Sequence, residues 1–303
     1  MIDVVEAGRH SSIQDRGRPG FERFGISPGG VADWFAAAVA NRLVGNAPDA
    51  ALIEATVSGP TLRWEREMTI AITGADCPDA SLPSWRATQA DAGSVLRLGP
   101  LEAGLRSYVA IRGGIEVPVV LGSRSLCASG AFGGGPGRSL RMGDRLAIGA
   151  MEEAVPLQDL WPLSHRLPLR GPWEVHVIPG PEAGAFDRSA LLRLSSTACL
   201  VTPAIDRMGV RLDTPGLHLE AAEVLTTPMT AGAIQVTPSG GLIALLADHP
   251  TTGGYPVIAT VISADLPLLA QARPGDTMRF REVSLAEAAR SWRRLTGWLD
   301  LGA

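Results

Sequence analysis

The chain has 303 residues, a length typical of about two domains that each bury a core. Its 27 basic residues are all arginine, because the sequence has no lysine, and 31 acidic residues give a formal net charge of -4. The missing lysine excludes Schiff-base chemistry, a biotinyl-lysine on this chain and a phosphate-loop lysine. The mildly acidic balance argues against a nucleic-acid binder, which would carry a basic surface.

The composition indicates a compact, turn-rich and mainly β protein. Hydrophobic residues make up 46% and charged residues 19%, with 35 glycines and 23 prolines, whereas disorder would need the opposite balance. Cys77, Cys127 and Cys199 form no C-x-x-C pair, so we expect reduced, buried thiols in a cytoplasmic protein. We expect no signal peptide and no membrane partner, since no apolar run approaches ~18 residues.

The first predicted element is a helix over residues 30–44, alanine-rich and ended by Gly45-Asn46. Short apolar runs between Gly, Pro and Asp then predict strands at 69–73, 94–98, 108–111, 145–148, 174–178, 233–236 and 242–246. This spacing favours a barrel or sandwich over alternating strands and helices.

One pattern occurs three times, at 92–99, 142–149 and 274–280: a small residue, glycine, a polar residue and then alternating apolar positions. Each copy predicts a tight turn that leads into a strand closing a barrel. Because the second and third copies are typical of domain ends, we place an N-terminal domain at 1–160 and a C-terminal domain at 161–303. The boundary region is 151–170.

The last predicted element is a helix over 284–299. Ser284 and Glu287 form an S-x-x-E capping box at its start. Leu285, Trp292 and Leu295 lie on one face at helical spacing, so we expect this face to pack on the second barrel.

Residues 25–29 match G-x-S-x-G, the pattern of a serine-hydrolase elbow. That elbow uses the backbone N–H of the residue after the serine, and here this residue is Pro28, which has none. A turn before the helix is therefore favoured.

The glycine-rich segment 130–138 matches no phosphate-binding pattern, so we expect a mobile loop and leave open that it covers a site. The histidines lack metal-ligand spacing, and we predict no metal site.

Three polar segments are candidates for a functional site. Asp15, Arg16 and Arg18 lie in a turn rich in glycine and proline, and Asp206, Arg207 and Arg211 repeat the pattern of an acid beside arginines. Guanidinium groups on fixed turns suit carboxylate or phosphate, although an Asp–Arg pair that braces each turn is an equal alternative. The third segment supplies Gln235, Ser239, Thr252 and Tyr255. Together they suggest one site for an anionic substrate.

Five segments in order, 12–33, 40–62, 72–76, 104–125 and 237–276, resemble the family that contains the C subunit of 5-oxoprolinase. This family is also called the biotin-dependent carboxyltransferase or allophanate hydrolase subunit 2 family. The resemblance covers about residues 5–282 and implies two cyclophilin-like β-barrel domains with a few peripheral helices, and an active cleft between them.

The resemblance implies one of two activities. The first is that of a subunit of an ATP-dependent 5-oxoprolinase, which opens 5-oxo-L-proline to L-glutamate. It would need a subunit-B-like partner that holds most of the ATP and Mg, and a subunit-A-like partner that completes ring opening. The second is biotin-dependent carboxyl transfer to urea. A non-enzymatic regulator that binds a kinase inhibitor and a purely structural subunit are further alternatives.

Two departures from the family favour the first activity. Val257 stands where the family often has lysine, and Asp206 and Val210 stand where asparagine and tyrosine are common. An extra carboxylate is unfavourable beside a carboxylated cofactor, so biotin is not expected. Under the first activity, the predicted catalytic residues are Asp15, Arg16, Asp206 and Arg207. The predicted substrate-binding residues are Arg18, Arg211, Gln235, Ser239, Thr252 and Tyr255.

Overall fold

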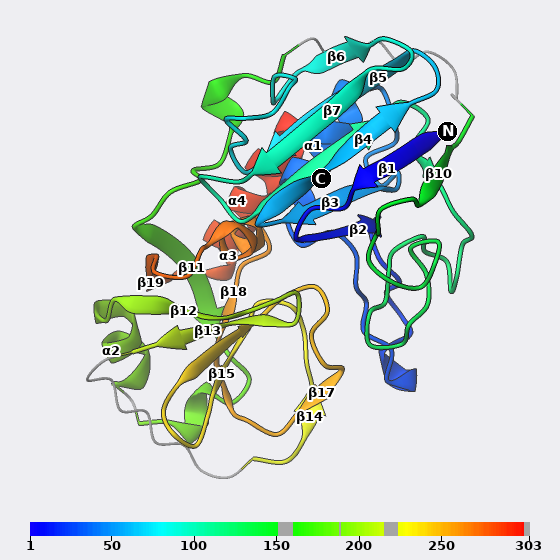
Figure 1. Cartoon of the computed structure of the whole chain (residues 1–303). Coiled ribbons are helices and arrows are strands. Elements are labelled where there is room, and N and C mark those ends of the chain that lie inside the picture. The colour runs from blue at the N-terminus through cyan, green and yellow to red at the C-terminus, as the bar shows by residue number, and fades with distance from the viewer. Residues whose placement is uncertain (151–159, 188, 215–223, 300–303) are drawn as a thin grey trace. The chain divides into compact units, whose positions relative to one another are not determined.

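The computed structural model of the chain describes residues 1–150, 160–187, 189–214 and 224–299 (Figure 1). Its architecture is mainly β, which confirms the predicted fold class. The chain divides into two compact units, residues 1–19 with 29–169 (unit 1) and residues 20–28 with 170–303 (unit 2). The sequence-based limits 1–160 and 161–303 stay a prediction, and much of the expected boundary region lies outside the described residues.

Unit 1 contains two antiparallel sheets of five strands, in the orders β7-β4-β1-β10-β9 and β2-β3-β8-β5-β6. Its elements are β1 (Ile2–Glu6), β2 (His10–Gln14), α1 (Trp34–Leu43), β3 (Leu52–Thr56), β4 (Ser58–Trp64), β5 (Met68–Gly74), β6 (Ala87–Ala90), β7 (Val95–Pro100), β8 (Arg106–Ile111), β9 (Ile115–Glu116), β10 (Arg145–Ile148) and a 3-10 turn (Leu163–His165).

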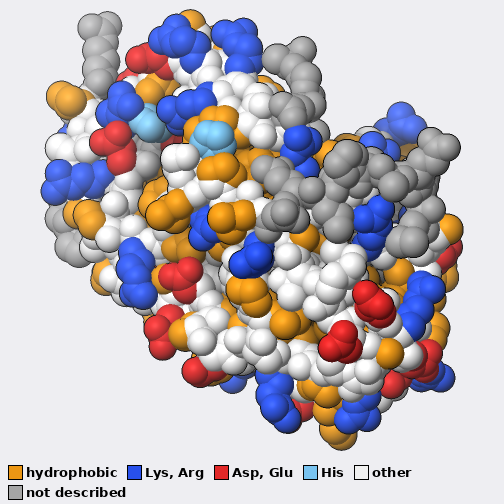
Figure 2. Space-filling view, turned by 90° about the horizontal axis from the view of Figure 1, so that it is seen from above, with side chains coloured by type: hydrophobic (Ala, Val, Ile, Leu, Met, Phe, Trp, Pro, Cys, Tyr) orange, Lys and Arg blue, Asp and Glu red, His pale blue; other side chains and the backbone are white. Residues whose placement is uncertain are grey.

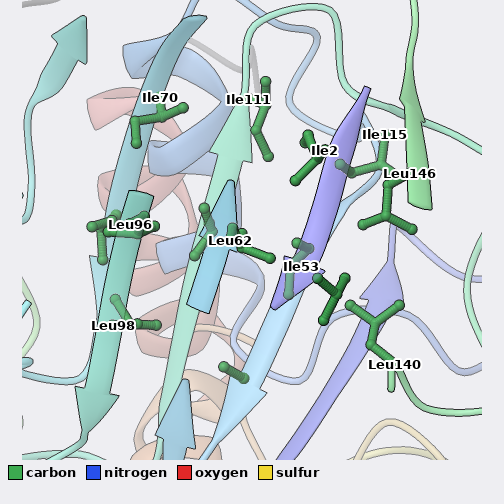
Figure 3. Close-up of a cluster of buried hydrophobic side chains, with 14 of the residues drawn as sticks. Ile2, Ile53, Leu62, Ile70, Leu96, Leu98, Ile111, Ile115, Leu140 and Leu146 are labelled. Carbon is green, nitrogen blue, oxygen red and sulfur yellow. The ribbon is translucent and has the colours of Figure 1, made fainter. Parts of the chain in front are cut away.

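The core of unit 1 is formed by apolar side chains from both sheets. Ile2, Leu62 and Leu96 come from the first sheet, and Ile53 and Ile70 come from the second; all five belong to one cluster (Figure 3) and are at most 1% exposed. Such two-sheet packing buries one face of each strand.

Strands β5 and β8 are buried on both faces, because α1 packs on the face opposite the core. Ile70 and Ile72 point into the core, while Thr73 donates a 2.7 Å hydrogen bond from its hydroxyl to the carbonyl of Ala36 in α1. The small side chains Ala36 and Ala37 of α1 are almost fully buried. The predicted helix is thus confirmed, from residue 34 to 43.

Unit 2 is a closed barrel in the order β11-β18-β15-β16-β13-β12-β19, with a separate two-stranded ribbon β14-β17. Its elements are a 3-10 turn (Glu22–Phe24), β11 (Trp173–Pro179), a 3-10 turn (Ala183–Ala185), α2 (Ala190–Ser196), β12 (Cys199–Ile205), β13 (Gly209–Asp213), β14 (Thr227–Pro228), β15 (Ala233–Val236), β16 (Leu242–Leu245), β17 (Thr252–Gly253), β18 (Val257–Val261), α3 (Leu266–Gln271), β19 (Thr277–Glu282) and α4 (Leu285–Trp298). Strand β19 closes the barrel by parallel pairing with β11.

All seven strands predicted from the sequence coincide with observed strands. The three repeated turns are also present, before β7, β10 and β19. Their glycines Gly93, Gly143 and Gly275 have φ angles of 76°, 88° and 93°. Space is open around all three, so the left-handed backbone, and not crowding, requires glycine there.

Helix α4 has the predicted capping box, in which Ser284 Oγ accepts from the Glu287 N–H and the Glu287 carboxylate accepts from Ser284 N–H. The expected burial of its apolar face is wrong for most of the helix. Leu285 is 72% and Trp292 38% exposed, whereas Leu295 is buried. None of the described helices is both long and apolar enough to cross a membrane.

Candidate functional site

Asp15 follows directly after β2, and its carboxylate is held by four donors. Its Oδ1 accepts from the Gly17 N–H at 2.8 Å and from the hydroxyls of Ser123 and Ser125 at 2.6 Å each. Its Oδ2 accepts from the Arg124 N–H at 2.5 Å. Asp15 therefore joins two segments more than one hundred residues apart through hydrogen bonds in a buried place.

Arg18 lies beside this network and is 1% exposed. Its Nη2 donates to the carbonyl of Ser125 and lies 3.5 Å from Ser123 Oγ, and its guanidinium lies 5.1 Å from the centre of the Phe132 ring. Its Nε and Nη1 are buried and have no hydrogen-bond partner in the part of the chain that the structure describes. Buried donors of this kind are rare in native structures and need an explanation.

The glycine-rich segment 130–138, which we predicted to be a mobile loop, packs on the same place; its mobility stays a prediction. The Gly134 N–H donates to the Arg124 carbonyl at 2.9 Å, and the Cys127 N–H donates to the Phe132 carbonyl at 2.9 Å. A Cβ on Gly133 would collide with the Ser125 carbonyl and lie 3.1 Å from Arg18 Nη2. Glycine is required because the backbone passes so close to the Ser125 carbonyl, in a left-handed conformation with a φ of 72°.

Arg16 differs from its neighbours Asp15 and Arg18. Its side chain is 68% exposed and pairs with Asp49, at 3.5 Å between Nη1 and Oδ2. It is therefore free to turn toward a solvent-borne anion at little cost, since exposed pairs of this kind contribute little to stability.

A second buried polar network of unit 1 was not predicted. The Tyr108 hydroxyl donates to Glu54 Oε2 at 2.9 Å and accepts from the Asp33 N–H at 2.8 Å, while Glu54 Oε2 also accepts from the Ala32 N–H at 2.8 Å. Arg106 Nε lies 3.9 Å from Glu54 Oε1. Burial raises the pKa of Tyr108 well above its ordinary value, so the hydroxyl stays protonated. This network fixes the entry to α1.

In unit 2, Arg207 and Asp248 form a two-pronged ion pair. Arg207 Nε and Nη2 each donate to one oxygen of the Asp248 carboxylate at 2.9 Å, and the two side chains are only 10% and 16% exposed. Asp206 Oδ1 accepts from the N–H groups of Met208 and Gly209 at 2.7 and 3.1 Å. Its carboxylate thus braces its own turn through the backbone.

Residues 20–28 belong to unit 2, where Ser27 Oγ donates to the Ala247 carbonyl at 3.4 Å. Ala247 directly precedes Asp248, so the G-x-S-x-G segment lies near the Arg207–Asp248 pair. The serine acts here as a contact of a turn, in line with the interpretation favoured from Pro28.

Arg211 and Gln235 lie on one outward row of the barrel. Arg211 pairs with Ile243, Ile243 with Gln235, and Gln235 with Val257, so the four side chains point to the same face. Arg211 is exposed, whereas Gln235 is 5% exposed. Val257 is buried in a small apolar cluster with Met229. Along this row, the guanidinium of Arg211 comes first and the apolar Ile243 follows it. The amide of Gln235 comes next, before Val257.

The ribbon β14-β17 covers this row. The Gln235 side-chain amide donates to the Tyr255 carbonyl and to Met229 Sδ, both at 3.4 Å. A Cβ on Gly253 would lie 2.6 Å from Gln235 Nε2, so the ribbon approaches so closely only because residue 253 is glycine. Thr252, in β17, is exposed, and Tyr255 is 42% exposed.

Ser239 lies in the turn between β15 and β16. Its hydroxyl is 3.0 Å from that of Thr237, which donates to the Gly241 carbonyl at 3.1 Å.

The predicted site residues form two sets, one in each unit. Asp15, Arg16 and Arg18 lie in unit 1, and Asp206, Arg207, Arg211, Gln235, Ser239, Thr252 and Tyr255 lie in unit 2.

On the face shown in Figure 2, arginine side chains are interspersed with acidic ones and do not form a single basic surface. The three cysteines are free and buried, and burial raises the pKa of Cys77 to about 11 and of Cys199 to about 12. The thiols of Cys77 and Cys199 therefore stay protonated near neutral pH. Within the described part of the chain, no three metal-ligating side chains come together.

Residues missed from the sequence include Ser123, Ser125, Phe132 and Asp248. Ser123 and Ser125 flank an arginine in the segment G-S-R-S. This pattern predicts no site by itself, because its role depends on the contact with Asp15. Asp248 was visible only as one polar residue in a polar segment. Neither pairing has a sequence signal, because each joins positions at least 41 residues apart.

The chain is similar to known proteins along nearly its whole length. The family model of the carboxyltransferase domain, subdomain A and B, matches residues 24–282. The chain is 36% identical to the C subunit of 5-oxoprolinase from Haemophilus influenzae, over 99% of this chain and 97% of that protein. It is 37% identical to the protein of the same name in Escherichia coli, over 96% of this chain and 94% of that protein.

Among solved structures, urea amidolyase of K. lactis superposes with a TM-score of 0.90 at 29% identity. The match covers 99% of this chain but 20% of that one. The chain spans about half or less of the length of the solved chains that it resembles. From the family model and the two full-length relatives, the chain belongs to the carboxyltransferase-domain family that includes the C subunit of 5-oxoprolinase.

Proposed function

We propose that this chain is a subunit of an ATP-dependent 5-oxoprolinase complex, which converts 5-oxo-L-proline to L-glutamate. The observation that carries the proposal is the 36–37% identity along 97% and 94% of two proteins named as the C subunit of 5-oxoprolinase. The name of these relatives implies other subunits. We assign a subunit-B-like partner, which holds most of the ATP and Mg, and a subunit-A-like partner, which completes ring opening.

The chemistry explains why arginines are needed. The carbonyl of a lactam is a poor electrophile, so ATP first phosphorylates the carbonyl oxygen, and water then opens the ring. Both the substrate carboxylate and the transferring phosphate are anions. Fixed cations stabilise them most where charge develops. Arg16, Arg18, Arg207 and Arg211 are the candidate cations, and Arg207 is already oriented by Asp248.

The acids and hydroxyls then have supporting roles. Asp15 has all its described acceptor bonds to serines and backbone N–H groups, so it positions the segment around Arg18. Asp206 shapes the turn that carries Arg207. Gln235, Ser239, Thr252 and Tyr255 supply hydrogen bonds to the polar groups of the substrate. We place the complex in the cytoplasm, a reducing compartment, because the three cysteines are free.

A second candidate is biotin-dependent carboxyl transfer, favoured by the superposition on urea amidolyase. Val257 argues against it. Its side chain is 2% exposed in an apolar cluster, at the position where the resembling family often has lysine. No ammonium is available there to bind a carboxylated cofactor, so we rank this function second.

ATP hydrolysis tests the proposal directly. The chain is co-purified with its subunit-B-like partner, and phosphate release is measured with 5-oxoproline, or with urea plus a biotin carrier protein and bicarbonate. Stimulation by 5-oxoproline alone is the expected result. Stimulation by urea with the carrier alone would overturn the proposal in favour of carboxyl transfer. A stable complex that neither substrate stimulates would favour a regulatory role.

A further inference from the structure

Arg18 carries two buried donor nitrogens, Nε and Nη1, that no atom of the described residues accepts from. The side chain is 1% exposed, and only Nη2 has acceptors, the Ser125 carbonyl and Ser123 Oγ. Nε and Nη1 have none. A buried guanidinium is costly unless it is paired with an anion. The Arg18 guanidinium stays buried at this cost, and the Asp15 carboxylate lies near it.

Asp15 does not supply an acceptor for Nε and Nη1 of Arg18. Its carboxylate oxygens accept from Gly17, Arg124 and the two serines, and no ion pair joins it to Arg18 among the described residues. Arg18 and Asp15 bind the same two serines, so the serines hold the guanidinium in a fixed orientation. The unsatisfied donors belong to a preorganised cation.

The glycine-rich segment covers this cation. The Phe132 ring stacks on the guanidinium, and the Gly133 backbone lies against Nη2. The tip of the segment is exposed at Gly130, Ala131, Gly135 and Pro136. Among the described residues, the backbone hydrogen bonds of residues 130–137 to the neighbouring chain are two between Cys127 and Phe132, one from the Ala131 N–H to the Ala128 carbonyl and one from the Gly134 N–H to the Arg124 carbonyl. Few bonds must therefore break for the segment to lift.

We propose that Arg18 is the receptor for an oxyanion, a phosphate or a carboxylate, and that residues 130–137 form a gate over it. When the gate lifts, Nε and Nη1 donate to the anion, and Ser123 and Ser125 hold the guanidinium in place. Assigning the anion to the substrate or to ATP rests on the proposed function. The binding of a simple oxyanion does not.

The test measures the binding of inorganic phosphate and of acetate to the full chain alone, in separate calorimetric titrations. Arg18→Gln removes the receptor and is expected to weaken binding at least about tenfold. Arg63→Gln, which removes one exposed arginine of unit 1 outside the network, is the matched control and is expected to bind like wild type. Phe132→Ala weakens the gate and is expected to bind about fivefold more tightly.

Cys127 reports the gate itself. Its thiol lies under the segment and is 5% exposed. Saturating phosphate is expected to speed its alkylation, localised by peptide mapping, while Cys77, which is buried beside Ser107, serves as the internal control. Since Arg18→Gln and Phe132→Ala shift affinity in opposite directions, misfolding of one variant cannot imitate the pattern.

Tighter binding of phosphate than of acetate would identify the site with a phosphate group, and the reverse with a carboxylate. No saturable binding of either probe to wild type and to Phe132→Ala would overturn the inference, as would equal binding by Arg18→Gln and Arg63→Gln. Intact phosphate binding without ATP hydrolysis dependent on 5-oxoproline would overturn the proposed function and leave this site standing.

Discussion

Asp15 in unit 1 and Asp206 in unit 2 each precede an arginine, and each accepts a hydrogen bond from the backbone N–H two residues later, at 2.8 and 2.7 Å. From this shared turn the two regions diverge. In unit 1, the carboxylate spreads its remaining bonds over Ser123, Ser125 and a backbone N–H. In unit 2, Arg207 makes a direct two-pronged pair with Asp248.

The comparison shows that an Asp–Arg dipeptide does not predict an Asp–Arg pair. The aspartate side chain is short, so it bonds the backbone of its own turn. The arginine side chain is long, and it reaches a partner that only the fold brings near. Arg16 reaches Asp49, and Arg207 reaches Asp248. In both turns the aspartate therefore braces the backbone of its own turn, and in unit 1 Arg16 pairs with Asp49 and not with Asp15.

The largest effect is expected from Arg207→Ala. It removes one partner of a nearly buried ion pair and leaves the Asp248 carboxylate uncompensated, at a cost of about 3 kcal/mol in the free energy of unfolding. The protein stays folded, but ATP hydrolysis by the complex is abolished. Urea unfolding and phosphate release measure the two effects.

The double variant with Asp248→Ala sharpens this result. If the pair acts as a unit, the double variant loses clearly less than the sum of the single losses, by roughly 1–3 kcal/mol. An unchanged rate in Arg207→Ala would remove that residue from the site, and additive losses would contradict the paired arrangement.

The next effect is expected from Asp15→Asn. The Asn Oδ1 keeps the bonds to Gly17 and the serines, but its NH₂ faces the Arg124 N–H, so two donors meet where a donor met an acceptor. We expect a loss of about 2 kcal/mol in the free energy of unfolding, measured with urea. Ser125→Ala, which removes one hydroxyl, should cost about 1 kcal/mol. If Asp15→Asn were neutral, the network would not be held by charge.

A pH effect is expected from a third arrangement, the partly buried pair of Arg138 and Asp144 in unit 1, which is joined by two hydrogen bonds of 2.8 Å. Hydrogen bonding from Arg138 lowers the pKa of Asp144 in the folded protein. The pair therefore adds stability above the unfolded pKa of Asp, about 4, which is lost as the pH falls through the lower folded value.

Thermal unfolding from pH 7 to pH 2.5 measures this effect. Asp144→Asn should lower Tm by no more than about 3 °C at pH 7, and the difference from wild type should shrink at the acid end. Arg138→Gln is the matched control and should give the same pH profile. A difference that grew toward low pH would contradict the assigned direction.

The smallest effect is expected from Asp206→Asn. The Asn Oδ1 accepts from the Met208 and Gly209 N–H groups as the carboxylate does, so we expect a change within about 0.5 kcal/mol in the free energy of unfolding. The contrast with Asp15→Asn tests the comparison most sharply, since the same substitution is costly in one unit and neutral in the other. Equal losses of stability at the two sites would contradict the difference between the two turns.

Much of the fold followed from local sequence patterns. Alternating apolar runs predicted seven strands, alanine periodicity predicted α1, and Ser284 with Glu287 predicted the start of α4. Strand β2 was missed because Ser11, Ser12 and Gln14 are polar yet at most 1% exposed. The Ser11 hydroxyl donates to the Ala7 carbonyl and Gln14 Nε2 donates to Ser12 Oγ, and a period-two pattern does not reveal these partners.

The face of α4 shows the opposite error. Leu285, Trp292 and Leu295 have the spacing of a buried stripe, but only Leu295 is buried. Periodicity states which side chains share a face. It does not state how much of that face a neighbour covers, which depends on where the helix lies.

The sequence by itself determined the local choices: where turns need glycine, where strands and helices begin, that no lysine is available, and which residues were candidates for the site. Only the tertiary structure decided the partners, because hydrogen bonds and ion pairs form between atoms brought within about 3 Å by chain segments far apart in sequence. It gave Asp15 two serines, gave Arg207 an aspartate, placed Arg211 and Gln235 on one row, and left two donors of Arg18 without an acceptor.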